Sequence, residues 1–172
     1  MNATLKSKPA RKRSSAAAVA VQVAVATGGI PPAARLRRWA RAAAPAGATA
    51  TLRVVGAAEG RRLNRAFRGK DHATDVLTFV YAEAPPQGDI VLCHPVLARA
   101  ARERGIALDA HYAHLVVHGM MHLQGHDHER DAEATRMERA EARVLASLGF
   151  ADPYAVESLH RARSGPARPR RR

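Results

Sequence analysis

Four short stretches of this chain have the apolar patterning of β-strands, and most of the remainder has a helical period. The strand candidates are "VAVQVAVA", "ATATLRVV", "DVLTFVY" and "GDIVLCH". Helical patterns cover "AARLRRWARAAA", then "AAEGRRLNRAFRG" up to Gly69, and most of the chain after Pro95. Two strand–helix units, then two strands and a run of helices, predict an α+β or mixed α/β fold. We expect one four-stranded sheet packed by helices, in an order that the pattern does not specify.

Two features within these segments predict the position of a tryptophan and the connection between two strands. Trp39 lies on the apolar face of its helix, which predicts a core position. The stretch Pro85-Pro86-Gln87-Gly88 predicts a loop between the third and fourth strands.

The positive charge of the chain is concentrated at its two ends. The net charge is +13, but residues 1–15 carry five basic side chains and residues 161–172 carry six. The remainder holds 17 basic and 15 acidic residues, a net charge of only +2. The sequence therefore predicts a single domain over 16–160 between two disordered basic tails, 1–15 and 161–172. Such tails either bind a polyanion such as RNA or serve only for solubility.

Cysteine content and hydropathy indicate a cytoplasmic protein. Cys93 is the single cysteine, so no internal disulfide can form, and we expect it to be a buried small side chain in a reducing compartment. No run of eighteen apolar residues predicts a membrane span. The N-terminal stretch also resembles a secretory leader or a transit peptide. The alternation of Val19, Val21 and Val23 favours a strand of the mature protein instead.

Six of the nine histidines lie between His111 and His128, and residues 118–128 read "HGMMHLQGHDH". On a helix, His118 and His122 project from one face about 6 Å apart along the axis. Gly125 can end the helix in the left-handed conformation, so that the chain returns His128 to the same point. Three imidazoles with an open fourth position are typical of a catalytic zinc site. The sequence thus predicts one Zn²⁺ held by His118, His122 and His128.

The same spacing occurs in the zinc-peptidase pattern H-E-x-x-H-x-x-G-x-x-H, but Gly119 stands where the general-base glutamate is required. A peptidase is therefore the least favoured activity. His111 and His114 share the face of His118 and could orient ligands or simply pack. His126 is expected to face solvent, and Asp127 is either a turn residue or a carboxylate that orients an imidazole.

The histidine motif resembles the HGxLHLxGYDH-type motif of the YbeY family of bacterial rRNA maturation endoribonucleases. The segments "LNRAFRGKDHATDVLTF", "QGDIVLCHPV" and "LGFADPY" also resemble that family, so the likeness runs from about Val19 to Tyr154. Met121 replaces the usual leucine and His126 the usual tyrosine, and neither position is a ligand.

This resemblance implies a zinc-dependent endoribonuclease specific for single strands. Its substrate would be ribosomal RNA, including the 3′ end of small-subunit (16S) rRNA, with a role in ribosome quality control on the small ribosomal subunit. The ligands of the family fall on His118, His122 and His128, and its functionally important arginine falls on Arg68. Zinc is expected to lower the pKa of a bound water towards 7, with Arg68 neutralising charge on the phosphate.

Basic residues also support RNA as the partner. Arg61, Arg65 and Arg68 form a helical stripe that could follow a phosphate backbone, although a solvated helix face is an alternative for Arg61 and Arg65. The aromatic content of 4% argues against an extensive base-stacking surface. A non-catalytic ribosome-associated factor, which binds rRNA and uses zinc only for its fold, remains the second hypothesis.

Overall fold

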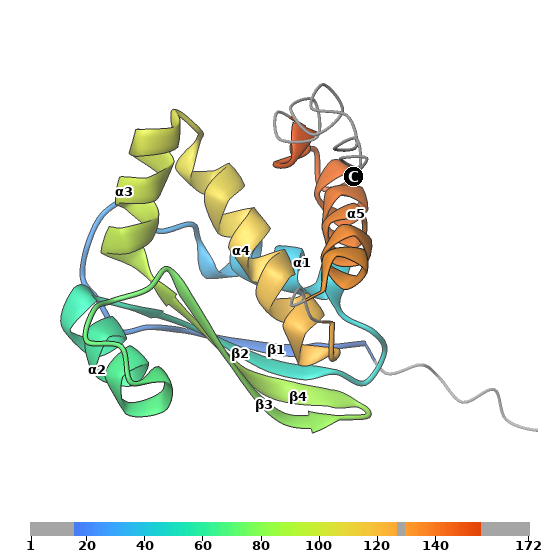
Figure 1. Cartoon of the computed structure of the whole chain (residues 1–172), viewed down its shortest axis with the longest axis horizontal. Coiled ribbons are helices and arrows are strands. Elements are labelled where there is room, and N and C mark those ends of the chain that lie inside the picture. The colour runs from blue at the N-terminus through green and yellow to red at the C-terminus, as the bar shows by residue number, and fades with distance from the viewer. Residues whose placement is uncertain (1–15, 127–129, 156–172) are drawn as a thin grey trace, which may run out of the picture.

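The computed structural model describes residues 16–126 and 130–155. Both predicted basic tails, 1–15 and 161–172, lie outside the described residues. The helices and strands occur in this order: β1 (Ala18–Val23), α1 (Ala33–Ala43), β2 (Thr49–Val55), α2 (Ala57–Arg68), β3 (Val76–Glu83), β4 (Pro86–Cys93), α3 (His94–Arg104), α4 (Leu108–Leu123) and α5 (Asp131–Ser147). The predicted α+β class with one four-stranded sheet is confirmed, and the helix that carries the histidines lies in the C-terminal half (Figure 1).

The sheet has the strand order β1-β2-β4-β3. Strands β1, β2 and β4 are parallel, and β3 pairs antiparallel with β4 and forms one edge. The loop predicted at Pro85–Gly88 is wrong, because β4 already begins at Pro86, which pairs with Glu83. A proline is tolerated at the first residue of a strand, where no ladder hydrogen bond needs its missing N–H group.

The two faces of the sheet are covered by different helices. Successive residues of a strand point to opposite faces. Leu52, Ile90 and Leu92 point to the face where α1, α4 and α5 build the main core. Val91 and Cys93 point to the other face, where they pack with Leu63 of α2 in a smaller cluster. Figure 1 shows α2 at the lower left, at one end of the sheet and away from α4 and α5. Helices α2 and α4 therefore flank the sheet from opposite sides.

Burial confirms two predictions about single residues. Trp39 is 2% exposed and meets the ring of Phe150 edge-on, with ring centroids 5.7 Å apart. Cys93 is buried, and this burial raises the pKa of its thiol. In the part of the chain that the structure describes, none of the helices has the length and hydropathy to cross a bilayer.

Two glycines end helices as the sequence predicts. Gly69 follows α2 with φ +66°, and its N–H group donates to the carbonyl of Arg65. Gly125 lies just beyond α4 with φ +78°. Both angles lie in the left-handed region, which glycine adopts without a steric cost. At Gly125 the chain therefore turns away from the α4 axis one turn after the second predicted zinc ligand.

Candidate metal centre

Two predicted ligands, His118 and His122, lie together on α4. Their Nε2 atoms are 3.1 Å apart, and their rings meet edge-on with centroids 4.5 Å apart. This geometry follows from their spacing, because residues four apart on a helix lie one turn above each other on the same face. The structure places the two imidazoles on one face of α4, as their spacing predicts, and their role as zinc ligands stays a prediction.

Hydrogen bonds at the other ring nitrogen orient each imidazole. His118 Nδ1 lies 2.9 Å from Oε1 of Glu141, and His122 Nδ1 lies 2.9 Å from the backbone carbonyl oxygen of His126. A carboxylate and a carbonyl can only accept, so in both rings Nδ1 carries the proton. In the neutral imidazoles, the unprotonated Nε2 atoms then direct their lone pairs into the same space.

A cation between the two Nε2 atoms would accept both lone pairs, and the separation of these atoms suits zinc. Zinc–nitrogen bonds of about 2.0–2.1 Å in a tetrahedral arrangement place two ligand nitrogens about 3.3 Å apart. The observed 3.1 Å is close to that value. Nδ1–H donation to an oxygen is also the usual way in which proteins orient zinc-bound histidines. The residues present therefore fit a zinc ion.

The third predicted ligand, His128, lies outside the described residues, as does Asp127. Among residues 16–126 and 130–155, no group of three His, Cys, Asp or Glu side chains forms a metal cluster. The three-ligand site therefore remains a prediction, of which the structure describes two members.

Sequence reasoning missed Glu141, a residue that the structure places at the centre of a polar network behind His118. Glu141 is fully buried, and its second oxygen, Oε2, accepts from His114 Nε2 at 3.1 Å and from the hydroxyl of Tyr154. Burial alone would raise the pKa of this carboxyl, but the hydrogen bonds from His114, His118 and Tyr154 lower it to about 2. Glu141 is therefore a buried carboxylate that remains ionised at neutral pH.

A signal for Glu141 was present in the sequence. Met137, Glu141 and Leu145 are spaced four apart, and all three are buried on α5. An acidic residue within an apolar helical stripe requires a polar partner, because burying a charge without one is costly. The partner lies 23 residues away on another helix, and the pattern alone does not identify it.

The other histidines have different environments. His114 contacts Glu141 and so supports the site indirectly, one of the two roles that the sequence left open. His111 is buried and neither ring nitrogen has a hydrogen-bond partner among the described residues; burial lowers its pKa. His111 is therefore a packing residue. His126 is exposed, as predicted, although its carbonyl orients His122.

The structure gives a physical reason for Gly119. A Cβ atom at this position would lie 2.8 Å from Cγ2 and 2.9 Å from Cδ1 of Ile90, closer than real Cβ contacts. Helix α4 thus lies so close to β4 that a side chain at position 119 would require Ile90 to shift. The packing of α4 on the sheet therefore disfavours the glutamate that a zinc peptidase needs at this position.

A small cavity adjoins the histidine pair. It has a volume of about 200 Å³ and is lined by His118, Ala134, Met137, Glu138, Glu141 and Tyr154. This space lies between α4, α5 and the segment after α5.

Arg68, the arginine assigned from the resemblance, is not next to the histidine pair in the described structure. It is exposed and forms the last residue of α2, on the other face of the sheet from α4. Within the described residues, no hydrogen bond or ion pair joins Arg68 to His118 or His122. A substrate that touches both would have to reach from one face of the sheet to the other.

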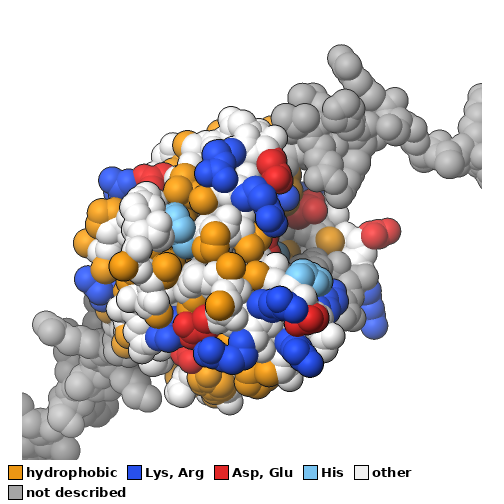
Figure 2. All heavy atoms as spheres, turned by 90° about the vertical axis from the view of Figure 1, so that its left-hand side faces the viewer, with side chains coloured by type: hydrophobic (Ala, Val, Ile, Leu, Met, Phe, Trp, Pro, Cys, Tyr) orange, Lys and Arg blue, Asp and Glu red, His pale blue; other side chains and the backbone are white. Residues whose placement is uncertain are grey.

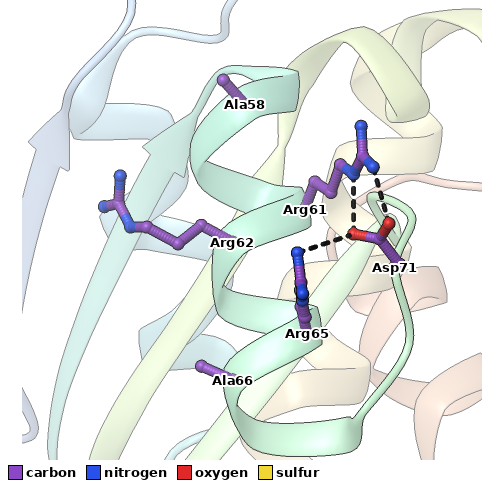
Figure 3. Close-up of a pocket in the computed structure, with 6 residues that line it drawn as sticks. All are labelled: Ala58, Arg61, Arg62, Arg65, Ala66 and Asp71. Carbon is purple, nitrogen blue, oxygen red and sulfur yellow. Dashed lines mark hydrogen bonds and ion pairs between the residues drawn. The ribbon is translucent and has the colours of Figure 1, made fainter.

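Arg61 and Arg65 surround an open hollow on α2 together with Ala58, Arg62, Ala66 and Asp71 (Figure 3). Arg61 binds Asp71 through two hydrogen bonds of 2.8 and 2.6 Å, and Arg65 Nη1 lies 4.0 Å from the same carboxylate. The hydrogen bond from Arg61 lowers the pKa of Asp71. Of the predicted basic stripe, Arg61 and Arg65 therefore lie on one surface that Asp71 partly neutralises, whereas Arg68 does not line the hollow.

Comparisons with known proteins agree with this fold and with the histidine motif. A family model described as Endoribonuclease YbeY matches residues 36–149. Endoribonuclease YbeY of Aromatoleum aromaticum is 61% identical over 126 residues, which cover 73% of this chain and 82% of that protein. Endoribonuclease YbeY of an Azoarcus species is 58% identical over 130 residues, and the chain spans about half of its length, 52%.

A solved structure supports the fold separately. The solution structure of a Thermotoga maritima protein matches with a TM-score of 0.50 and 22% identity, covering 90% of this chain and 99% of that one. At this level of identity the match concerns the fold alone. The family model covers more than half of the chain and the relatives share most of their aligned residues with it, so the chain belongs to the endoribonuclease YbeY family.

Proposed function

We propose that this chain is a zinc-dependent endoribonuclease that cuts single-stranded ribosomal RNA, including the 3′ end of 16S rRNA, on or near the small ribosomal subunit. The family supports the endoribonuclease activity. The proposed zinc requirement rests on the Nε2 atoms of His118 and His122, which lie 3.1 Å apart. An oxygen at Nδ1 fixes the orientation of each ring. His128 is proposed as the third ligand.

The residues of the chain have separate tasks in this proposal. A bound zinc ion would supply a Lewis acid that activates water or a substrate oxygen at neutral pH. Glu141 holds His118 in the tautomer whose Nε2 can bind the ion, and the His126 carbonyl does the same for His122. Without Glu141, His118 could also place its proton on Nε2 and lose its lone pair there. Gly119 leaves no general-base side chain at the peptidase position, which argues against peptide hydrolysis.

Arg68 is proposed to bind a phosphate of the RNA. Its guanidinium is exposed at the end of α2, and arginine matches the geometry of phosphate oxygens through paired N–H groups. Because α2 and α4 flank the sheet, the RNA would pass the edge strand β3 between Arg68 and the histidine pair. In this arrangement Arg68 binds the substrate strand at a distance from the cleaved bond. Groups closer to the histidines then stabilise the negative charge that develops at that bond.

The test measures zinc content and RNA cleavage on the same preparations. The substrate is a single-stranded fragment from the 3′ end of 16S rRNA, and the proteins are wild type, His122→Ala, Arg68→Glu and the control Arg38→Glu, an exposed arginine of α1. We expect one zinc per wild-type chain, loss of zinc and cleavage in His122→Ala, and zinc without efficient cleavage in Arg68→Glu. Arg38→Glu should behave as wild type.

The products identify the attacking group. A 2′,3′-cyclic phosphate end indicates attack by the RNA's own 2′ hydroxyl, and a 5′-phosphate end indicates attack by water. Zinc-loaded protein that binds this RNA but never cuts it would refute the nuclease and favour the non-catalytic ribosome-associated factor.

A further inference from the structure

The hollow on α2 is a second basic feature, separate from the histidine pair. Its floor is formed by the small side chains Ala58 and Ala66, with Arg62 on one side and Arg61 and Arg65 on the other (Figure 3). Because alanine side chains are short, the guanidinium groups rise above the floor and form its rim. Basic side chains also gather over the lower part of this side of the molecule (Figure 2).

Within residues 16–126 and 130–155, most N–H donors of these arginines have no hydrogen-bond partner and can bind a ligand. A guanidinium has five N–H donors. Arg61 uses Nε and Nη2 for Asp71, whereas Arg65 lies 4.0 Å from Asp71 and Arg62 lies 3.9 Å from Glu59, both beyond hydrogen-bond distance. The side chains of Arg62 and Arg65 are 71% and 73% exposed. Three arginines around the hollow therefore face two carboxylates, Asp71 and Glu59, so the net charge of the group is positive.

An exposed aromatic ring lies at the end of the same helix. Phe67 is 65% exposed and meets Phe79 of β3 edge-on, with centroids 4.9 Å apart. On β3, Tyr81 is 67% exposed, and its hydroxyl donates to Asp89 at 2.8 Å. The chain has few aromatic residues, yet two of them are exposed on α2 and the neighbouring edge strand. Phe67 follows Arg65 by two residues, so it projects from nearly the opposite side of α2, towards β3. Single-strand binding proteins combine cationic side chains that bind phosphates with rings that stack on bases.

We propose that α2 binds a segment of single-stranded RNA outside the cleavage site, through Arg62 and Arg65 at the hollow and Phe67 at the end of the helix, where it faces β3. Arg62 and Arg65 bind phosphates across the hollow, and Phe67 stacks on a base at the end of the helix. The segment continues past Arg68 and the edge strand β3 towards the histidine pair. This inference rests on the proposed nuclease function and extends it to the path of the substrate. Asp71 fixes the side chain of Arg61 through their ion pair, and this pair lies at one edge of the surface.

Charge complementarity favours RNA over an acidic protein as the occupant. A guanidinium rim around a shallow floor accepts the evenly spaced phosphates of any sequence, and it offers no deep pocket for a specific side chain. Arg61 and Arg65, four residues apart, lie about 6 Å from each other along the helix axis, so charges recur along the path of a strand.

The test is binding of a labelled twelve-nucleotide 2′-O-methyl oligouridylate, which has no free 2′ hydroxyl to attack a phosphate, to the zinc-loaded full chain. Fluorescence anisotropy between 50 and 200 mM salt compares wild type with Arg62→Gln/Arg65→Gln. The control, Arg38→Gln/Arg143→Gln, removes the same charge from exposed positions of α1 and α5. We expect binding about tenfold weaker for the α2 variant. The slope of log K against log salt should fall by about 1.4, since each lost phosphate contact on a single strand accounts for about 0.7.

Phe67 is tested by a pair of variants. Phe67→Leu keeps an apolar side chain but removes the ring, and we expect at least about fivefold weaker binding. Phe67→Tyr keeps the ring and should bind as wild type does. Urea unfolding of each variant confirms that the fold is intact.

Each outcome decides one claim. An α2 variant that binds with wild-type affinity and slope overturns the proposed surface, and so does an equal loss in the control, which would show a general effect of net charge. Displacement of the oligonucleotide by an acidic peptide at lower concentration would assign the surface to a protein instead. Zinc-loaded wild type that cuts no RNA refutes the nuclease, while the binding comparison still decides whether α2 binds RNA.

Discussion

Replacing Glu141 by glutamine tests whether the buried carboxylate supports the histidine pair as a charge. The substitution keeps the size of the side chain and removes its negative charge. In the wild type, its two oxygens accept from His118, His114 and Tyr154. In Glu141→Gln one oxygen becomes an amide donor that faces other donors, so at least one hydrogen bond is lost and a buried group is left unsatisfied.

The magnitude follows from the pKa of Glu141. Its pKa falls from an ordinary 4.5 to about 2 on folding, because hydrogen bonds from the histidines and the tyrosine outweigh the effect of burial. A group whose pKa is lower in the folded state stabilises the fold above its unfolded pKa, and this stabilisation is lost as the pH falls from 4.5 towards 2. The full contribution at pH 7 is about 3 kcal/mol, of which about 1 kcal/mol is lost by pH 3.5.

The assay is urea unfolding followed by circular dichroism, with a chelator present, at pH 7 and pH 3.5. We expect Glu141→Gln to be less stable than wild type by about 3 kcal/mol at pH 7 and by clearly less at pH 3.5. Glu103→Gln is the control, because its carboxylate is 68% exposed and pairs only loosely with Arg99 at 3.8 Å. If the free energy of unfolding differs between wild type and Glu141→Gln by the same amount at both pH values, the claim that Glu141 is ionised in the folded protein is refuted.

Three further substitutions probe the packing and the ligands. Gly119→Ala should reduce the free energy of unfolding by about 1–3 kcal/mol, because its Cβ would lie 2.8 Å from Ile90. Tyr154→Phe removes the hydroxyl that donates to Glu141 and should cost about 1–2 kcal/mol in urea unfolding. His122→Ala should weaken zinc binding by more than about 100-fold in chelator competition.

Controls and contrary outcomes accompany these substitutions. Gly28→Ala is matched to Gly119→Ala, because nothing lies within 4 Å of a Cβ atom there; equal losses for the two would contradict the contact with Ile90. If Tyr154→Phe is as stable as wild type, the hydrogen bond from the Tyr154 hydroxyl to Glu141 does not contribute to the stability of the fold. For the ligand, His72→Ala serves as an exposed histidine, and unchanged zinc affinity in His122→Ala would remove this residue from the site.

Local patterns predicted the parts of this protein that depend on neighbours in the sequence. The spacing of His118 and His122 was sufficient to place both imidazoles on one helical face, and Gly69 and Gly125 end their helices as expected. The number of strands was also predicted, because alternating and apolar runs are local features.

Features that depend on distant contacts could not be read from the sequence. The order β1-β2-β4-β3 depends on how the strands pair in space. Glu141 meets His118 only because α5 packs on α4, and the chain between them gives no sign of it. Likewise, Asp71 reaches Arg61 because the segment after α2 folds back along the helix. The position of Arg68 on the other face of the sheet follows from the side on which α2 packs, which the pattern of α2 does not specify.

Catalytic and ligand residues often lie on loops, which open easily. Here the histidine pair lies on α4, in which ten of sixteen residues are buried and which packs between the sheet and α5. Its backbone amides should therefore exchange with solvent deuterium only when the whole domain opens, among the slowest in the molecule. The two imidazoles then belong to the cooperative folding unit itself, and a mutation that weakens the core anywhere would also lower the fraction of molecules able to hold the metal.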